Sequence, residues 1–413
     1  MKIAIAIEKF QPSAGGRERS TQQIARRLLS RGHAVTIFTN RADTGEDPLP
    51  GGKVVVRGGL NTRYAAGLWG FSRWAAREMG DGGFDATLSV GTAVPADVVQ
   101  LREGTVREEL KRKLDMKGGG ESMRTLRILA TLVKPKLMVR LALERKTLRD
   151  PRVKRIVAIS RYVARQLFDY YSLGVRRVTL IPNAAEVRAF DPAERLKIRE
   201  EVRRAFALND GEVVFLFVSM DPARKGLASL LRGFAAVVEA DPRAKLLVAG
   251  TLDAGWLEMA TALGVGDPVR WVGPTRMIDR LYVAADVCVL PTWYDPSSKV
   301  VLEALLHGLP AISTAHNGAS DWISYPAGPE AEALAEGNAG AESGPAAAPQ
   351  PAGRVIDDAG DIAALTAAMI ELCDDGERAR CAAAASTVGP QITMARHVDE
   401  LEALMMKLAA KTG

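Results

Sequence analysis

The sequence is poor in cysteine, has no long apolar run and lacks a signal peptide pattern. Its three cysteines, Cys288, Cys373 and Cys381, form no Cys-x-x-Cys pair, which argues against a disulfide framework and a cysteine zinc site. No stretch reaches the ~18 apolar residues that a membrane-spanning helix needs. Residues 1–7 predict a strand, because Glu8 follows before any long apolar segment. We therefore expect a cytoplasmic protein.

Several motifs of nucleotide and metal binding are also absent. The turn at residues 8–16 has no Gly-x-Gly-x-x-Gly, which argues against a nicotinamide dehydrogenase. The sequence has neither a P-loop nor an Asp-x-Asp pair that could hold a diphosphate through a metal. Its four histidines are scattered. We expect no metal and no cofactor, so cations and helix N-termini would have to neutralise a bound diphosphate.

The composition is that of a folded protein with more than one domain. With 413 residues, 47% hydrophobic and 25% charged, the chain is long enough for two or three cores. The net charge of +6 arises locally, because residues 107–149 hold 13 Lys or Arg against 5 Asp or Glu. The rest of the chain is slightly acidic. Since no nucleic-acid recognition module is present, we expect no nucleic-acid partner.

Short Val, Ile and Leu runs alternate with stretches of helical period, which predicts parallel strands joined by crossover helices. The predicted strands are residues 3–7, 34–39, 53–57, 86–90, 155–159, 178–181, 213–218, 245–249, 269–272, 286–290 and 311–313. A polar connector at 183–211 interrupts this alternation. The pattern predicts an α/β fold of two doubly wound, Rossmann-like domains that face a central crevice.

The predicted domains are residues 1–187 and 188–390, followed by a C-terminal helix in 391–413 that we expect to pack back on the first domain. Residues 326–351 are rich in Ala, Gly, Pro and Glu. They predict a disordered insertion within the second domain.

Three loops carry candidate binding residues. Gly15 and Gly16 precede the first predicted helix, where backbone N–H groups can approach an anion; a flexible turn is the alternative. Arg224 and Lys225 follow the first strand of the second half, and adjacent fixed cations suit a diphosphate. The alternative is two solvated cations before a helix.

The third loop, residues 291–308, joins a strand to a very apolar helix. Ser297 or Ser298 can cap this helix near Lys299, directing its first amides toward whatever Asp295 faces. Glu303 lies within the apolar helix, where a carboxylate needs a partner. A hydroxyl-rich ligand is one such partner, and a structural bond to the backbone is the alternative.

Together these loops resemble the retaining nucleotide-sugar glycosyltransferases of family 4, which have the GT-B fold. The resemblance rests on Gly-Gly-x-Glu, Arg-Lys-Gly and an acid seven residues before Glu303, and it covers nearly the whole chain. Within the family it is nearest to the glucosyltransferases of the lipopolysaccharide core. Supporting segments are Pro95-Ala96-Asp97, Ala158-Ile159-Ser160-Arg161 and Ile181-Pro182-Asn183.

The resemblance implies a role for each matching residue. Gly15 and Gly16 line the diphosphate or sugar side, Arg224 and Lys225 neutralise the leaving diphosphate, and Asp295 binds the sugar hydroxyls. Glu303 binds the ribose, amides of Ser298 to Val301 hold phosphates, and Val272 to Thr275 border the base.

The implied donor-binding residues are Gly15, Gly16, Ser219, Arg224, Lys225, Thr275, Asp295, Ser298, Lys299, Val300, Val301 and Glu303. The implied catalytic residues are Asp97, on the acceptor side, with Arg224, Lys225 and Asp295.

Two positions depart from the family pattern. Asp295 stands where the family usually has Glu, so its reach is one methylene shorter and the donor-sugar pocket can differ. Ala184 follows Asn183 where the family usually has Gly, which bears on the turn between the domains.

The basic segment 107–149 has two interpretations. Leu126, Leu129, Leu132 and Val133 recur among its cations at helical spacing, as in a basic amphipathic helix on an anionic membrane surface. An ordinary helix that packs its apolar face inward fits the same pattern.

The sequence thus predicts an enzyme that transfers a glucose-like sugar, with retention, from a UDP-linked nucleotide sugar to a lipid-linked or saccharide hydroxyl. Lipopolysaccharide core or cell-envelope glycan synthesis, at the inner face of the membrane, is the expected setting. The alternatives are a GT-B-type sugar-nucleotide epimerase and a non-catalytic membrane-surface binding protein.

Overall fold

The computed structural model describes residues 1–12, 15–43, 47–119, 125–127, 130, 134–325 and 350–410. It divides into unit 1, Met1–Asn183 with Met394–Gly413, and unit 2, Ala184–Thr393. Almost all of the predicted insertion lies outside the described residues, as do parts of the basic segment 107–149. No helix in the described part of the chain is both long and apolar enough to cross a membrane.

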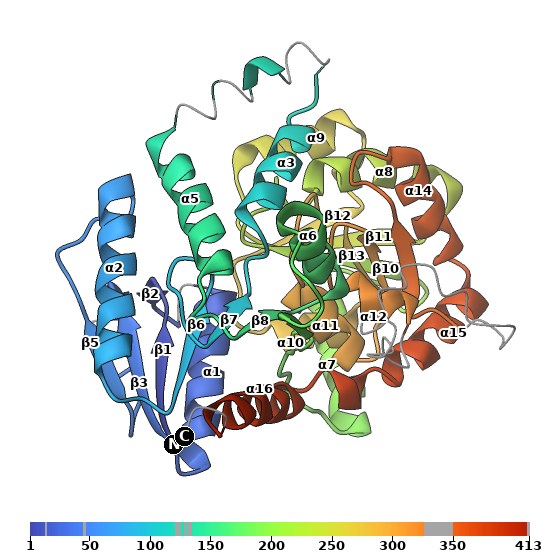
Figure 1. The fold of residues 1–413 in the computed structure, drawn as a ribbon. Helices are drawn as coiled ribbons and strands as arrows, with labels where there is room; N and C mark the ends of the chain where they lie inside the picture. Colours follow the sequence, from blue (N-terminus) through green and yellow to red (C-terminus); the bar gives the residue numbers. More distant parts are fainter. Residues whose placement is uncertain are drawn as a thin grey trace, which may run out of the picture. The chain divides into compact units, whose positions relative to one another are not determined.

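Unit 1 is built on a seven-stranded sheet in the order β5-β3-β1-β6-β7-β8-β9, and every pairing in it is parallel (Figure 1). Its strands are β1 (Lys2–Ala6), β3 (Ala34–Thr39), β5 (Lys53–Val56), β6 (Ala86–Val90), β7 (Val98–Leu101), β8 (Arg155–Ala158) and β9 (Val178–Leu180). β2 (Lys9–Phe10) and β4 (Arg41–Ala42) form a separate pair. The sequence prediction missed β7.

The helices of unit 1 include the last helix of the chain. They are α1 (Gly16–Ser30), α2 (Ala65–Asp81), α3 (Val106–Met116), α5 (Pro135–Arg149), α6 (Arg161–Tyr171) and α16 (Met394–Ala409). α16 packs against α1 and β6, and it buries Val398, Leu401 and Met405. Arg31, which follows α1, forms ion pairs with Asp399 and Glu402. The C-terminal helix is thus part of unit 1.

Unit 2 has a six-stranded parallel sheet in the order β12-β11-β10-β13-β14-β15. Its strands are β10 (Val213–Ser219), β11 (Ala244–Gly250), β12 (Val269–Gly273), β13 (Val287–Leu290), β14 (Ala311–Thr314) and β15 (Gly353–Ile356). Counted along the unit, this is the order 3-2-1-4-5-6 of dinucleotide-binding folds, in which ligands bind where the order reverses, outside the carboxyl ends of the strands. The reversal falls between β10 and β13. The sequence prediction missed β15, but the α/β class with two parallel sheets is confirmed.

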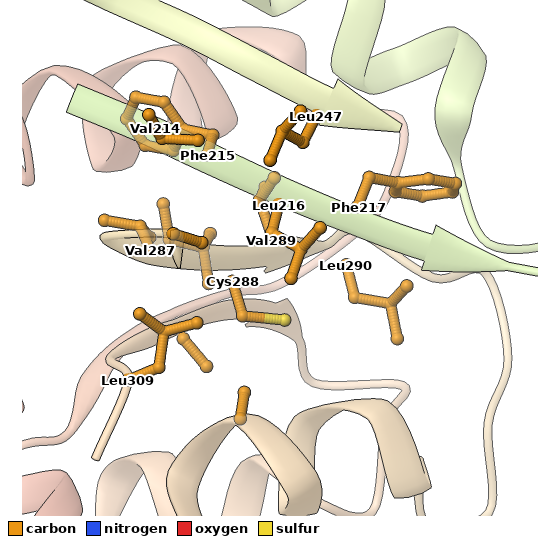
Figure 2. Close-up of a cluster of buried hydrophobic side chains, with 14 of the residues drawn as sticks. Val214, Phe215, Leu216, Phe217, Leu247, Val287, Cys288, Val289, Leu290 and Leu309 are labelled. Atoms are coloured by element: carbon orange, nitrogen blue, oxygen red, sulfur yellow. The ribbon is translucent and has the colours of Figure 1, made fainter. Parts of the chain in front are cut away.

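Helices flank the unit 2 sheet and enclose its core. They are α7 (Pro192–Ala205), α8 (Leu227–Ala240), α9 (Ala254–Ala262), α10 (Ile278–Ala284), α11 (Lys299–Leu306), α12 (Ser320–Ser324), α14 (Ile362–Glu371) and α15 (Asp375–Ser386). Figure 2 shows side chains of β10, β11 and β13 gathered in one cluster, in which Leu216 and Cys288 are neighbours across the strands. Burial raises the pKa of the Cys288 thiol to about 12. Cys288, Cys373 and Cys381 are all free and buried.

One close contact fixes the two loops that follow β10 and β13. Gly226, at the start of α8, has a φ of +83°, and a Cβ built on it would lie 2.0 Å from the Pro291 carbonyl oxygen. Only glycine can take this conformation without strain and leave room for that carbonyl. The backbone N–H of Trp293 also donates to the Arg224 carbonyl oxygen at 3.0 Å. The two loops are therefore held together by their backbones.

We expect Gly226→Ala to lower the free energy of unfolding of unit 2 by about 3 kcal/mol, because it adds a steric clash to an unfavourable φ. Gly264→Ala is the matched control, since Gly264 has a φ of +74° but no atom within 4 Å of a built Cβ. Gly264→Ala should lower the free energy of unfolding by only about 1 kcal/mol. Denaturant unfolding measures both, and equal losses would contradict a special role for the Gly226 contact.

Candidate functional site

The candidate site lies where the order of the unit 2 sheet reverses. The loop after β10 carries Arg224 and Lys225, and the loop after β13 carries Asp295. β10 and β13 are neighbouring parallel strands, so both loops leave the same carboxyl edge of the sheet. The sequence placed these residues in separate motifs, and the fold brings them together.

An ion pair joins the two loops through side chains. Lys225 Nζ donates to Asp295 Oδ2, and the two side chains are only 12% and 15% exposed. Burial lowers the pKa of the Lys225 ammonium, while the Asp295 carboxylate acts in the opposite direction. The pair therefore places one cation and one carboxylate in a mostly desolvated position at the sheet edge.

Arg224 is anchored beside this pair. Its Nε donates to Asp221 Oδ2 at 2.9 Å and its Nη1 to the Tyr294 carbonyl oxygen at 3.3 Å. Ser219, the last residue of β10, accepts a hydrogen bond from the Asp221 N–H at 2.8 Å. Ser219 thus shapes the turn that carries the two cations. Burial raises the pKa of Asp221, but its bonds to Arg224 outweigh this and leave the pKa lowered.

The N-terminus of α11 is held by Asn317, which the sequence analysis missed. Ser298 is the N-cap residue, but its side chain makes no capping bond. Its backbone N–H donates to Asn317 Oδ1 at 3.0 Å, and so does the Ala319 N–H, at the same distance. Asn317 Nδ2 donates to Ser313 Oγ at 2.9 Å, and Asn317 is 1% exposed. The Ser298 amide is therefore directed to Asn317, which leaves Lys299, Val300 and Val301 as the first helical positions.

Glu303 lies half-buried on α11 and has a tyrosine partner that the sequence did not indicate. Tyr282 on α10 donates its hydroxyl hydrogen to Glu303 Oε2 at 3.1 Å and also lies 3.2 Å from the Val300 carbonyl oxygen. Burial, followed by the Glu303 charge, raises the pKa of the Tyr282 hydroxyl well above its usual value. The phenol therefore stays protonated and orients the carboxylate.

Thr275 lies at the same carboxyl edge, in the loop between β12 and α10. Its Oγ1 accepts a hydrogen bond from the Met277 N–H at 3.1 Å. Thr275 therefore stabilises this loop.

Unit 1 has a cavity at its own point of strand reversal. The cavity has a volume of about 320 Å³ and is lined by Glu8, after β1, and Thr92, after β6. Gly15 and Gly16 begin α1 nearby in the chain, and Arg17 lines the cavity. Arg17 forms ion pairs with Glu18 and Glu103, both at 2.8 Å, while its buried Nε has no hydrogen-bond partner among the described residues.

Acidic side chains near Arg17 stabilise the charged form of its guanidinium. Burial by itself would lower the pKa of this guanidinium, but the carboxylates of Glu103 and Glu18 raise it above its usual value. A permanently charged, largely buried arginine with an unpaired nitrogen indicates a position where a polar ligand can bind.

The structure corrects the expectation for Asp97. This residue directly precedes β7, so it lies at the amino edge of the unit 1 sheet, away from the cavity. Its Oδ2 accepts hydrogen bonds from the Thr87 N–H and hydroxyl, at 2.9 and 2.7 Å. Its Oδ1 pairs with Lys154 Nζ at 2.9 Å. These bonds tie β6 to the chain before β8, and Asp97 is not among the residues that line the cavity.

No group of three or more His, Cys, Asp or Glu side chains with metal-binding geometry occurs within the residues that the structure describes.

The role of Asn317 can be tested by its removal. We expect Asn317→Ala to lower the free energy of unfolding of unit 2 by about 2–5 kcal/mol, because two buried amide N–H groups lose their acceptor. Ser320→Ala is the control, since the Ser320 side chain lies in the same turn but makes one hydrogen bond, to the Thr314 carbonyl oxygen. It should cost about 1 kcal/mol. Denaturant unfolding compares the variants. If Asn317→Ala lowers the free energy of unfolding no more than Ser320→Ala does, Asn317 does not hold the N-terminus of α11 as described.

Comparison with known sequences points to one family. Residues 212–375, within unit 2, match the family model described as glycosyl transferases group 1. The chain is 30% identical over 177 residues to a D-inositol 3-phosphate glycosyltransferase of Geodermatophilus obscurus, covering 40% of this chain and 38% of that protein. It is 28% identical over 174 residues to an uncharacterized glycosyltransferase of Methanocaldococcus jannaschii, covering 41% and 44%. The chain thus matches about two fifths of the length of these curated relatives.

Solved structures extend the likeness of fold to the whole chain. WaaG, a glycosyltransferase involved in lipopolysaccharide biosynthesis, superposes with a TM-score of 0.72 at 18% identity, covering 98% of this chain and 99% of WaaG. Anabaena Alr3699/HepE in complex with UDP and glucose gives a TM-score of 0.67 at 16% identity, covering 98% and 99%. These likenesses confirm the predicted GT-B fold class. Residues 212–375 are thus similar in sequence to the glycosyl transferases group 1 family, and the chain as a whole shares the fold of these glycosyltransferases.

Proposed function

We propose that the chain is a retaining glycosyltransferase that moves a glucose-like sugar from a UDP-linked donor to a hydroxyl of a lipid-linked or saccharide acceptor. The observation that carries this proposal is the pairing of Lys225 with Asp295 beside Arg224, at the reversal point of the unit 2 sheet. A nucleotide sugar needs cations for its diphosphate and carboxylates for its hydroxyls, and this site offers both within one loop pair.

The diphosphate is assigned to Arg224, Lys225 and the start of α11. The first amides of a helix have no carbonyl partner four residues earlier, and the helix dipole favours an anion there. When the bond from the anomeric carbon to the donor phosphate oxygen breaks, negative charge grows on the leaving diphosphate. Fixed cations and amides that face this charge lower the barrier.

The two carboxylates are assigned to the hydroxyls of the donor. Asp295 would accept hydrogen bonds from the sugar, and Glu303 from the ribose. Because Lys225 already pairs with Asp295, a bound diphosphate shares this cation with the carboxylate. The shorter reach of aspartate than of glutamate makes position 295 a determinant of which sugar fits.

The base is assigned to the backbone of Val272 to Thr275, where β12 ends. The UDP bound in the Alr3699/HepE complexes supports uracil as this base. Transfer then joins the acceptor oxygen to the anomeric carbon with its configuration unchanged, and it releases UDP and the acceptor's proton.

The acceptor is assigned to the unit 1 cavity that contains Arg17 and Glu103. Carboxylates and cations both line this cavity, since Arg140 is there too and pairs with Glu109 at 2.7 Å. Paired charges of both signs can accept from and donate to sugar hydroxyls, which are both donors and acceptors themselves. This chemistry suits a polyhydroxylated acceptor.

A lipid-linked acceptor would bring the enzyme to the membrane surface through segment 107–149. Of the apolar positions in its central part, Leu126 is 61% exposed, and Met138 on α5 is 45% exposed. Leu129, Leu132 and Val133 lie outside the described residues. Exposed apolar side chains among cations favour contact with anionic headgroups, while Leu143 and Leu148 of α5 are buried in unit 1. We therefore propose a peripheral location at the inner membrane face, in cell-envelope glycan synthesis.

We expect Lys225→Ala and Arg224→Ala each to weaken UDP binding by about 10–100-fold, the equivalent of one charge-assisted hydrogen bond. Lys245→Ala is the control, because Lys245 on β11 pairs with Glu212 away from the site. Calorimetric titration measures the three affinities. Unchanged UDP affinity in both site variants would remove the basis of the donor assignment.

The anomeric configuration of the product tests the reaction. NMR of the glycoside formed from a UDP-α-sugar should show the α configuration, and a chelator should leave the rate unchanged, because no metal is assigned to the diphosphate. A β-linked product would contradict retention, and loss of activity with the chelator would contradict the role of the two cations.

A further inference from the structure

Unit 2 has a cavity at the opposite edge of its sheet from the proposed donor site. Its volume is about 760 Å³, within the size range of small-molecule sites. Asp286, which precedes β13, and Pro310, which precedes β14, line it. Lys225 and Asp295, by contrast, lie in loops that follow the carboxyl ends of strands in the same sheet. The cavity therefore belongs to a different surface of unit 2.

The walls of this cavity carry an excess of positive charge. Arg195 and Arg199 of α7 and Arg378 of α15 line it, together with the acids Asp286 and Asp375. Both acids are already paired. Asp286 binds Arg199 and the buried Arg203, each at 2.6 Å, and Asp375 binds Arg378 at 2.5 Å.

Arg195 is the cation that these acids leave uncompensated. It pairs with no carboxylate in the described part of the chain, and its Nη2 donates to the His307 carbonyl oxygen at 3.0 Å. A guanidinium has five N–H donors. Arg195 therefore retains donors, and a full charge, for an anion in the cavity.

The remaining wall is largely apolar. Leu196, next to Arg195 on α7, is 65% exposed although it is a large apolar residue, and Leu309 and Ala379 also line the cavity. An apolar surface beside one unpaired guanidinium matches a ligand with an anionic head and an apolar body.

We propose that this cavity binds a small amphipathic organic anion, with its phosphate or carboxylate head on Arg195 and its apolar body against Leu196, and that its occupancy changes donor affinity. The second part rests on the proposed function, because it acts through Glu303.

Tyr282 links the cavity to Glu303. Tyr282 lines the cavity, and its ring stacks on His307 with 5.4 Å between the ring centroids. Its hydroxyl binds Glu303 Oε2 and the Val300 carbonyl oxygen. His307 is fixed in turn by Asp279, at 3.0 Å from Nε2. A ligand that moves this stack therefore moves the hydroxyl that orients Glu303, and the coupling is reciprocal at equilibrium.

Calorimetric titration with phenyl phosphate and with benzoate tests the site itself, and phenol is the uncharged comparison. We expect one of the two anions to bind saturably to the full chain, which identifies the preferred head, and phenol not to bind. Arg195→Ala and Leu196→Asp should each weaken binding at least tenfold. Arg204→Ala, at an exposed position of α7 outside the cavity, should leave it unchanged. No saturable binding by either anion would overturn the proposal, as would equal affinity in Arg195→Ala.

The coupling is tested by measuring UDP affinity with and without the saturating anion. We expect at least a threefold change in the unaltered chain and none in Tyr282→Phe, which keeps the ring but loses the hydroxyl. An unchanged UDP affinity in the unaltered chain would overturn the coupling, and a change that persists in Tyr282→Phe would overturn its route through the Tyr282 hydroxyl. If UDP does not bind at all, the donor assignment fails, while the anion titration still decides whether the cavity is a site.

Discussion

The backbone contact between the loop after β10 and the loop after β13 is the constraint on which the candidate site depends. Gly226 admits the Pro291 carbonyl oxygen, and Trp293 donates to the Arg224 carbonyl oxygen. Because the two backbones are fixed, Lys225 and Asp295 lose little further conformational freedom when they form their mostly buried ion pair. A ligand that replaces part of this pairing therefore meets charges that are already positioned, so little reorganisation is needed when charge develops on a leaving group.

Two residues outside α11 position its functional groups. Asn317 holds the loop that precedes the helix, so the first helical amides remain oriented toward the sheet edge, and Tyr282 fixes Glu303 one turn later. The two positioning residues lie outside α11, 19 and 21 residues in sequence from the groups that they hold. Unit 1 follows the same rule, because its cavity also lies at the reversal of its sheet and combines paired charges with Arg17.

Sequence patterns predicted those features that depend on neighbouring residues. Apolar runs and helical periods indicated two parallel α/β halves, and the loops with Arg224, Lys225 and Asp295 were found because they follow strands. The prediction missed β7 because Gln100 interrupts its apolar run. It missed β15 because Gly353 and Arg354 leave only two apolar residues there, close behind the Ala-, Gly-, Pro- and Glu-rich residues 326–351. Asn317 and Tyr282 carry no motif, since their roles arise only from tertiary contacts. Asp97 looked like an acceptor-side acid, but its position before β7 puts it at the wrong edge of the sheet.

Hydrogen exchange of the full chain with and without UDP tests the donor site most directly. Binding at the reversal point predicts slower exchange of amides in residues 219–227 and 298–302, while those of the amino-edge residues 284–287 change little. Slowing confined to other segments, or no slowing in the first two at saturating UDP, would contradict the assignment of the donor to this edge of unit 2.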